Sequence, residues 1–268
     1  MSTLSVLFIG DIVGSIGRRA VVELLPGLKQ EFNPDLVIAN GENAAHGKGI
    51  TVATAEELRM AGIDWLTTGD HCFDQAASVA DCFDSSLPIL RPANYAAEAP
   101  GRGYSVIATA KGDILLINLI GRVFMAKNYD DPFRKSQEII KSFTDKKFSA
   151  IIIDMHAEAT SEKIALRHSL DGTISLLTGT HTHVQTADNQ VTAAGTGYLS
   201  DAGMTGFADG VIGLEAAPII ASYLTQTKQP HVIPETGRAI LSAVYATIDP
   251  TSGTCLSVTP LQRFIDIR

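Results

Sequence analysis

Polar side chains follow five short apolar runs of this sequence, at the point where each run ends. Carboxylates, amides and imidazoles are the groups that bind metal ions or move protons. The residues concerned are Asp11 after LFIG, Asn40, Glu42 and Asn43 after LVIA, Asp70 and His71 after LTTG, Asp154 and His156 around the end of AIII, and His181 and His183 after SLLTG. Their repeated placement predicts one shared site.

The types of these residues favour a metal centre. His181 and His183 are two residues apart, so in an extended segment both imidazoles would point to the same side and reach one metal. Imidazoles combined with carboxylates and an amide suit Mn²⁺, Fe or Zn²⁺ better than the all-oxygen shells that Mg²⁺ and Ca²⁺ prefer. The supply of donors exceeds what one ion takes, which favours two metals sharing a carboxylate. Two metals about 3.5 to 4 Å apart typically clamp the oxygens of a phosphoryl displacement, so we predict a hydrolase.

Each histidine also has an ordinary structural interpretation. A single histidine after a strand is more often a hydrogen-bonded surface or core group than a ligand. We expect His46, His168 and His231 to be structural, because they lie in a loop, a predicted helix and a C-terminal loop.

Two glycine-rich segments look like phosphate-binding loops but do not match them. GDIVGSIGR lacks the spacing G-x-G-x-x-G, and in GENAAHGKGIT the residue after Lys48 is Gly49, where a Walker loop has Ser or Thr. These glycines are better explained by a close approach of the backbone to a metal or an anion.

The first half of the chain alternates apolar runs, polar loops and predicted helices. Helices are expected at residues 18–32, 54–61 and 75–83. Runs that are apolar throughout indicate central strands covered on both faces, which is an α/β pattern. The carboxyl ends of parallel strands converge on one crevice, so the polar residues that follow them can meet.

The second half contains hairpin signals. Residues 103–121 predict two strands joined by a turn at 111–113, and a second hairpin is expected to turn at residues 250–253. Between them, FSAIIID, TISLLTG and GTGYLSD each predict a strand. Parallel strands followed by hairpins predict a mixed sheet, or two sheets packed face to face between helices. Without a linker or repeat, we expect residues 1–268 to form one domain.

Composition limits the possible partners. The net charge of −8 and the pI near 5.3 argue against binding duplex nucleic acid, which needs a basic face. No apolar run approaches the roughly 20 residues of a membrane span, and Met1 leads straight into a predicted strand, so a cytoplasmic location is expected. The three cysteines predict free thiols, and a homo-oligomer such as a dimer is possible.

Eight motifs together resemble the YmdB-type metallophosphoesterases, a bacterial branch of the calcineurin-like phosphoesterase superfamily. The similarity runs from about residue 4 to residue 215, and the last 50 or so residues match only in general character. The motifs are FIGDIVGSIGR, NGENAAHGKGIT, TTGDHCFD, RPANY, GRVFM, HAEATSEK, GTHTHVQTAD and DAGMTG.

The resemblance implies a four-layer α/β/β/α sandwich of two mixed sheets flanked by helices. It also implies hydrolysis of phosphodiesters, 2′,3′-cyclic nucleotides in particular, by a hydroxide that bridges two metals. Mn or Fe would be the main ions, with Zn or Mg as alternatives. By motif, Asp11 and His183 would hold one metal, Glu42 would bridge, and Asp70, His156 and His181 would hold the other.

Two further roles follow from the same motifs. Asn43 would help to orient substrate or solvent beside Glu42, and His71 would be a general acid that is not a ligand. Proton donation of this kind is commonly worth about 10² to 10⁴ in rate. Arg91 or Arg122 would meet a phosphate, although structural ion pairs are an equally good explanation for both arginines.

One position departs from the family pattern. The family reads G-N-H where this chain has Gly69-Asp70-His71. A carboxylate in place of the amide removes about one positive charge from the metal core and makes it a weaker Lewis acid. Two alternatives therefore stand beside the phosphodiesterase: a catalytically weakened metal-binding regulatory protein, and a phosphomonoesterase or nucleotidase.

Overall fold

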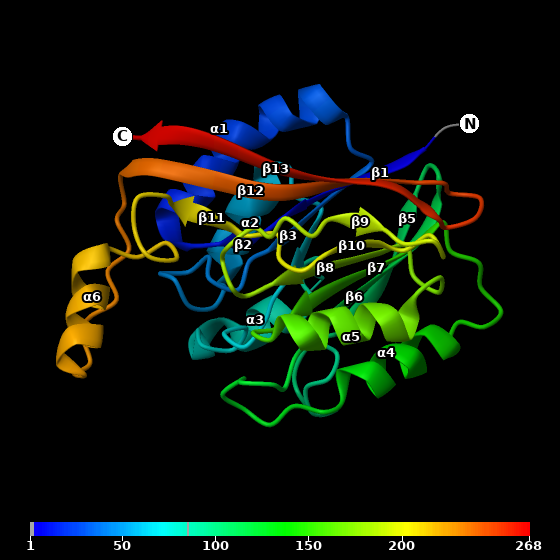
Figure 1. Cartoon of the computed structure of the whole chain (residues 1–268), viewed down its shortest axis with the longest axis horizontal. Coiled ribbons are helices and arrows are strands. Elements are labelled where there is room, and N and C mark those ends of the chain that lie inside the picture. Colours follow the sequence, from blue (N-terminus) through cyan, green and yellow to red (C-terminus); the bar gives the residue numbers. More distant parts are fainter. Residues whose placement is uncertain (1–2, 85) are drawn as a thin grey trace.

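Two β-sheets pack face to face, and helices cover their outer faces. The structure is a computed structural model, and it describes residues 3–84 and 86–268. Figure 1 shows the layers edge-on, with α1 on one side of the sheets and α4 and α5 on the other. The predicted four-layer sandwich of two mixed sheets is confirmed.

The first sheet joins strands from both ends of the chain. β1 pairs in parallel with β3 and antiparallel with β12, which in turn pairs with β13. Its strands are β1 (Leu4–Ile9), β2 (Asp11–Ile12), β3 (Leu36–Asn40), β4 (Trp65–Thr67), β11 (Met204–Phe207), β12 (Gly237–Ile248) and β13 (Cys255–Ile267).

The second sheet is formed by the middle of the chain. β6, β7, β8 and β10 are parallel, and β5 and β9 run antiparallel at its two edges. Its strands are β5 (Tyr104–Thr109), β6 (Gly112–Ile120), β7 (Ala150–His156), β8 (Leu176–Thr180), β9 (Gln190–Val191) and β10 (Gly197–Leu199).

Two of the helices begin at identifiable capping signals. Thr51 and Thr54 form a capping box at the start of α2, and Asp131 caps α4, whose first residue is Pro132. The helices are α1 (Gly14–Phe32), α2 (Val52–Met60), the 3₁₀ turn η1 (Ala76–Ser78), α3 (Val79–Phe83), α4 (Pro132–Lys141), α5 (Thr160–Leu170) and α6 (Ala216–Thr225).

Successive residues of the central strands enter different hydrophobic cores. In β1, Val6 and Phe8 pack in the core between the two sheets, whereas Leu7 and Ile9 pack in the core that contains residues of α1 and α2. Both faces of the strand are therefore buried, which explains the continuous apolar runs in the sequence. Full burial of one such side chain contributes roughly 1.5 to 3 kcal/mol.

The predicted hairpins are present. β5 and β6 pair antiparallel, and β12 and β13 form a long hairpin with its turn between residues 248 and 255. The helix expected at residues 75–83 is shorter than predicted, because a 3₁₀ turn occupies its first part. Among the residues described, no helix is both long enough and apolar enough to cross a membrane.

Candidate metal centre

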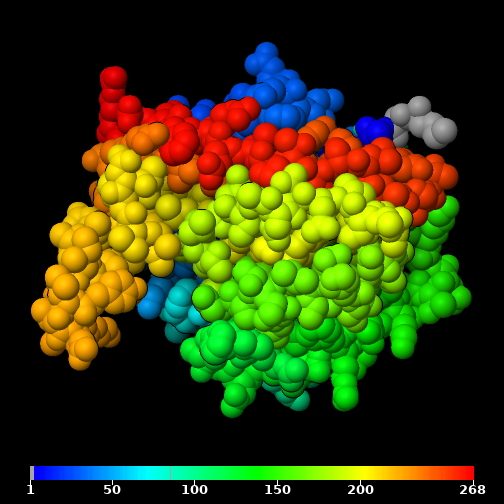
Figure 2. All heavy atoms as spheres, in the orientation of Figure 1, coloured from blue at the N-terminus to red at the C-terminus, as the bar shows by residue number. Residues whose placement is uncertain are grey.

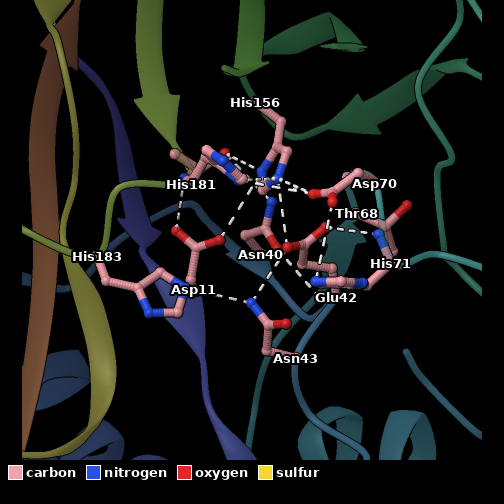
Figure 3. Close-up of polar contacts among 12 residues, drawn as sticks. Asp11, Asn40, Glu42, Asn43, Thr68, Asp70, His71, His156, His181 and His183 are labelled. Carbon is pink, nitrogen blue, oxygen red and sulfur yellow. Dashed lines mark hydrogen bonds and ion pairs between the residues drawn. The ribbon is translucent and has the colours of Figure 1, made fainter. Parts of the chain in front are cut away.

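The two sheets bring their strand ends to a common place. Asp11 lies in β2, directly after β1, and Glu42 follows β3. Asp70 follows β4, His156 is the last residue of β7, and His181 comes directly after β8. Figure 3 shows these side chains pointing toward one another. The predicted shared site is therefore present as a cluster, with contributions from both sheets.

Four of the predicted ligands form a compact set of donors. One donor atom from each of Glu42, Asp70, His156 and His181 lies within 4.8 Å of all the others. Nε2 of His156 is 3.1 Å from Oδ1 of Asp70, 3.3 Å from Oε1 of Glu42 and 3.0 Å from Nδ1 of His181. Ligands about 2.1 Å from a metal and at right angles to each other lie about 3 Å apart, so this spacing fits one coordination shell.

The other two predicted ligands lie beside this set. Asp11 is fully buried, its Oδ2 accepts a hydrogen bond from the His181 backbone, and its Oδ1 has no hydrogen-bond partner among the described residues. Figure 3 shows His183 next to Asp11. Nδ2 of Asn43 lies 3.2 Å from Nε2 of His183 and 3.1 Å from Oε1 of Glu42. A buried carboxylate oxygen that accepts no hydrogen bond from the protein is expected where a cation binds.

Each of the three histidines turns one ring nitrogen toward the cluster and has the other nitrogen engaged by a protein oxygen. Nδ1 of His183 lies 3.0 Å from the carbonyl oxygen of Ile212 and must be its donor, so Nε2 is the atom left without a proton. Nε2 of His181 lies 3.3 Å from Glu158, which leaves Nδ1 directed at His156. Metal-binding histidines have their second nitrogen engaged in this way.

Behind His156, a buried network fixes the third ring. The Thr180 hydroxyl donates to Oδ1 of Asp154 at 2.8 Å, so it must accept from Nδ1 of His156, 2.9 Å away. Nδ2 of Asn40 donates to Oδ2 of Asp154, and its Oδ1 accepts from the backbone N–H of Glu42. Burial raises the pKa of Asp154 to about 6, which leaves it mostly ionised and able to accept at neutral pH.

The negative charges of the buried carboxylates favour a bound cation in the cluster. Burial raises the pKa of Asp11 to about 7, and the charges of Asp201 and Glu42 add to the effect. Burial opposes a charge on His156, but Glu42, Asp70 and Asp11 together raise its pKa well above the usual value. A proton or a metal ion can supply this positive charge, and the donor set fits a transition metal.

Gly69 leaves room for the cluster. A Cβ at this position would lie 2.2 Å from Oε2 of Glu42 and 2.3 Å from Nε2 of His156. No side chain can be accommodated there unless the ligands move. Glycine at position 69 therefore keeps space free beside the donor atoms.

His71 lies at the edge of the cluster rather than within the four-donor set. Its Nδ1 is 2.8 Å from Oδ2 of Asp74, and its Nε2 is 3.8 Å from Oδ2 of Asp70. Its backbone N–H donates to Oε2 of Glu42 at 3.3 Å. The ring is 28% exposed, so a substrate can reach it from solvent.

The two arginines differ from each other. Arg91 is 6% exposed and its guanidinium donates to the backbone carbonyls of Pro92, Ala99 and Pro100, so among the described residues its partners are carbonyl oxygens and not carboxylates. Arg122 has a 47% exposed side chain and lies 3.4 Å from Asp131. The ion-pair interpretation therefore fits Arg122 alone.

The backbone at the two histidines is not extended. His181 has φ of 102° and His183 has φ of 65°, in a loop that follows β8. The assumption of an extended segment was wrong, although both rings do face the cluster. Such conformations cost of order 1 to 3 kcal/mol each in residues other than glycine, and they persist only where the surroundings impose them.

Several site residues could not be recognised from sequence. Glu158, Lys163, Thr180 and Asp201 all lie within the quoted motifs, but their residue types alone do not indicate the contacts that the structure shows. One signal was available for Lys163: it falls at the spacing of the buried Leu166 and Leu170 in α5, where a lysine is unexpected. His168 is on the exposed side of the same helix, as a structural residue would be.

The sequence matches one family model over most of its length. The model, described as YmdB-like protein, covers residues 7–261. The match therefore extends well beyond residue 215 and includes β12 and most of β13.

Related proteins align with nearly the whole chain. A 2′,3′-cyclic-nucleotide 2′-phosphodiesterase of Bacillus subtilis is 43% identical over 246 residues, 92% of each chain. Among solved structures, a novel phosphatase from Mycoplasma pneumoniae has a TM-score of 0.93 at 31% identity, covering 100% of this chain and 95% of its own. A hypothetical protein from Thermus thermophilus has a TM-score of 0.89 at 37% identity, covering 99% and 100%. The activities named for the first two proteins are both hydrolyses of phosphoric esters.

Proposed function

Because the chain belongs to the YmdB-like protein family, whose relatives are phosphoric ester hydrolases, we propose that it is a metal-dependent phosphodiesterase acting on nucleoside 2′,3′-cyclic phosphates. The name of the Bacillus subtilis relative supports the substrate class. The observation that carries the proposal is the orientation of three histidines, each of which directs one ring nitrogen into a cluster of carboxylates while the other nitrogen is engaged by a protein oxygen.

Two divalent metal ions are proposed, Mn or Fe in the first place and Zn or Mg as alternatives. Asp11 and His183 would hold one ion, Glu42 would bridge, and Asp70, His156 and His181 would hold the other; the close donor set of the last four supports this assignment. When bound, such ions act as Lewis acids on phosphate oxygens and lower the pKa of water.

His71 is proposed as the general acid. Asp74 accepts from Nδ1 and fixes the ring, so in the cationic imidazole Nε2 is the nitrogen that gives its proton to the leaving ribose oxygen. Asn43 is proposed to help orient the substrate, since its amide lies between Glu42 and His183.

The chain is proposed to work as one domain, because the ligands come from both sheets.

A homo-oligomer is also proposed, and the exposed apolar side chains of α6 support it. Ile220, Tyr223 and Leu224 are 52%, 77% and 80% exposed, and Figure 2 shows α6 standing away from the body beside a hollow. Light scattering on the wild type and on Leu224→Glu tests this proposal, and two identical monomer masses contradict it.

Hydrolysis of 2′,3′-cyclic AMP by the purified chain tests the function. With Mn²⁺ we expect release of adenosine monophosphate, loss of turnover in a chelator, and recovery when metal is returned. Faster hydrolysis of AMP than of the cyclic substrate indicates a phosphomonoesterase or nucleotidase. No turnover with Mn²⁺, Fe²⁺, Zn²⁺ or Mg²⁺ contradicts the proposal and favours the metal-binding regulatory protein.

A further inference from the structure

Lys163 carries a fully buried charge that none of the proposed catalytic steps uses. It lies in α5, and its side chain is 0% exposed. Nζ donates to the carbonyl oxygen of Thr180 and to Oδ2 of Asp201, both at 2.8 Å. A buried ion pair usually adds little net stability compared with apolar residues of the same volume. Its presence therefore needs an explanation other than stability.

Asp201 connects this lysine to two ligand-bearing segments. Its Oδ2 also accepts from the backbone N–H of Thr182 at 3.1 Å, and its Oδ1 accepts from the N–H of Gly203 at 2.9 Å. The carbonyl oxygen of Gly203 in turn accepts from the backbone N–H of Asp11 at 3.1 Å. One carboxylate therefore links the segment of the two histidines to the segment of Asp11.

The bonds fall on either side of a strained residue. Lys163 holds the Thr180 carbonyl group before His181, and Asp201 holds the Thr182 N–H after it. His181 has φ of 102° and His183 has φ of 65°, conformations that residues other than glycine adopt only under constraint. The pair supplies such a constraint at the peptide groups where it is needed.

We propose that Lys163 and Asp201 are positioning residues that hold the His181-Thr182-His183 turn, and through Gly203 the backbone of Asp11, in the metal-binding conformation. This inference rests on the proposed metal-dependent function. Neither residue touches the four-donor set, so they position its donors through the backbone. Asp201 also acts by its charge on Asp11, and for that reason the decisive variant leaves the pair with no change in net charge. Removing the pair weakens metal binding even where the fold survives.

The decisive variant removes both charges together. Lys163→Met alone leaves the Asp201 carboxylate buried without its cation. This destabilises the protein whether or not the pair affects metal binding. The double variant Lys163→Met with Asp201→Asn is neutral at the pair. It releases the Thr180 carbonyl group. Thr182 and Gly203 donate to different oxygens of Asp201, and asparagine replaces one of these oxygens with an NH2 group that cannot accept, so one of the two bonds is lost. Asp201→Asn alone keeps the bond from Lys163 to the Thr180 carbonyl group but leaves the lysine without its anion, so its Mn²⁺ affinity is compared only if the variant remains folded.

Mn²⁺ affinity is the readout, measured from the paramagnetic resonance signal of free Mn²⁺ during titration. We expect both variants to bind Mn²⁺ about 10- to 100-fold more weakly than the wild type, the range typical of outer-shell substitutions. Thermal unfolding in chelator shows whether the fold is retained. Turnover on 2′,3′-cyclic AMP is measured separately.

Lys111→Met is the matched control. Nζ of Lys111 also donates to one backbone carbonyl group, that of Thr3, and to one carboxylate, that of Asp35 at 2.7 Å. It lies in the β5–β6 turn, away from the strand ends that carry the ligands. Its loss should leave Mn²⁺ affinity unchanged.

Two results overturn the inference. The first is a folded double or single variant that binds Mn²⁺ as tightly as the wild type. The second is a Lys111→Met variant whose affinity falls as far as that of the pair variants, because the effect would then be general destabilisation. A wild type that binds Mn²⁺ but hydrolyses no phosphodiester contradicts the proposed function alone, since the affinity comparison still decides the role of the pair.

Discussion

The hydroxyl of Thr180 lies 2.9 Å from Nδ1 of His156 and 2.8 Å from Oδ1 of Asp154. It donates to the carboxylate and accepts from the ring, so it sets which nitrogen of His156 carries a proton. The register of β7 against β8 creates this contact, because His156 pairs directly with Thr180. The tautomer of a candidate ligand is thus determined by the alignment of two strands.

Thr180→Val removes this link while keeping the shape of the side chain. It leaves Oδ1 of Asp154 without the Thr180 donor and the Nδ1–H of His156 without an acceptor, which costs about 1 to 3 kcal/mol of stability. Metal affinity should fall about 10- to 100-fold. Thr178→Val is the control, because its hydroxyl lies in the same strand and has no hydrogen-bond partner among the described residues. Equal Mn²⁺ affinities in the two variants contradict the assigned tautomer.

Gly69→Ala should abolish metal binding and turnover. The added Cβ would lie 2.2 Å from Oε2 of Glu42 and from Cδ2 of His156, so the donors must separate. Metal content after dialysis is the measurement. Gly27→Ala is the control: a Cβ there meets nothing within 4 Å, and alanine in a helix is favoured over glycine by about 1 kcal/mol. Full metal content in the Gly69→Ala variant contradicts the prediction.

Asp70→Asn should raise turnover on 2′,3′-cyclic AMP several-fold. The substitution restores the family's amide and leaves more positive charge on the metals, which strengthens their attraction for phosphate. Metal content must be measured in parallel, because Asp70 belongs to the close donor set. A variant that keeps its metals but is slower than the wild type refutes this account of position 70.

His71→Ala should lower kcat by about 10² to 10⁴ with metal content unchanged, because a proton donor is lost and no ligand is. His168→Ala is the control, since that histidine is exposed on α5. A loss of metal in His71→Ala instead assigns His71 to the coordination shell.

Sequence reasoning located the cluster because α/β folds place their strand ends together. Asp11, Glu42 and His156 could be chosen from local context alone, since each follows an apolar run. No tertiary contact was needed for that step. The same reasoning predicted both hairpins from their turn residues.

The supporting contacts depend on information that a single sequence does not display. Thr180 contacts His156 because the register of β7 and β8 places them opposite each other. Lys163 contacts Asp201 because the packing of α5 brings the two side chains together. Arg91 was misjudged because its partners are backbone carbonyl groups of the following loop, which carry no sequence signal. The positive φ of His181 likewise follows from tertiary bonds rather than local preference.

β1 has its antiparallel neighbour at the far end of the chain: Leu4 pairs with Ile248. Asp11 and His181, which share a hydrogen bond, are 170 residues apart. During synthesis, β1 leaves the ribosome long before β12, and it remains an open edge until that strand arrives. The last candidate ligand, His183, also precedes β12 in the chain, so every donor is synthesised before that edge of β1 is covered. Completion of the first sheet therefore follows the synthesis of all the candidate ligands, and β12 and β13 close a sheet that already carries Asp11, Glu42 and Asp70 at its strand ends.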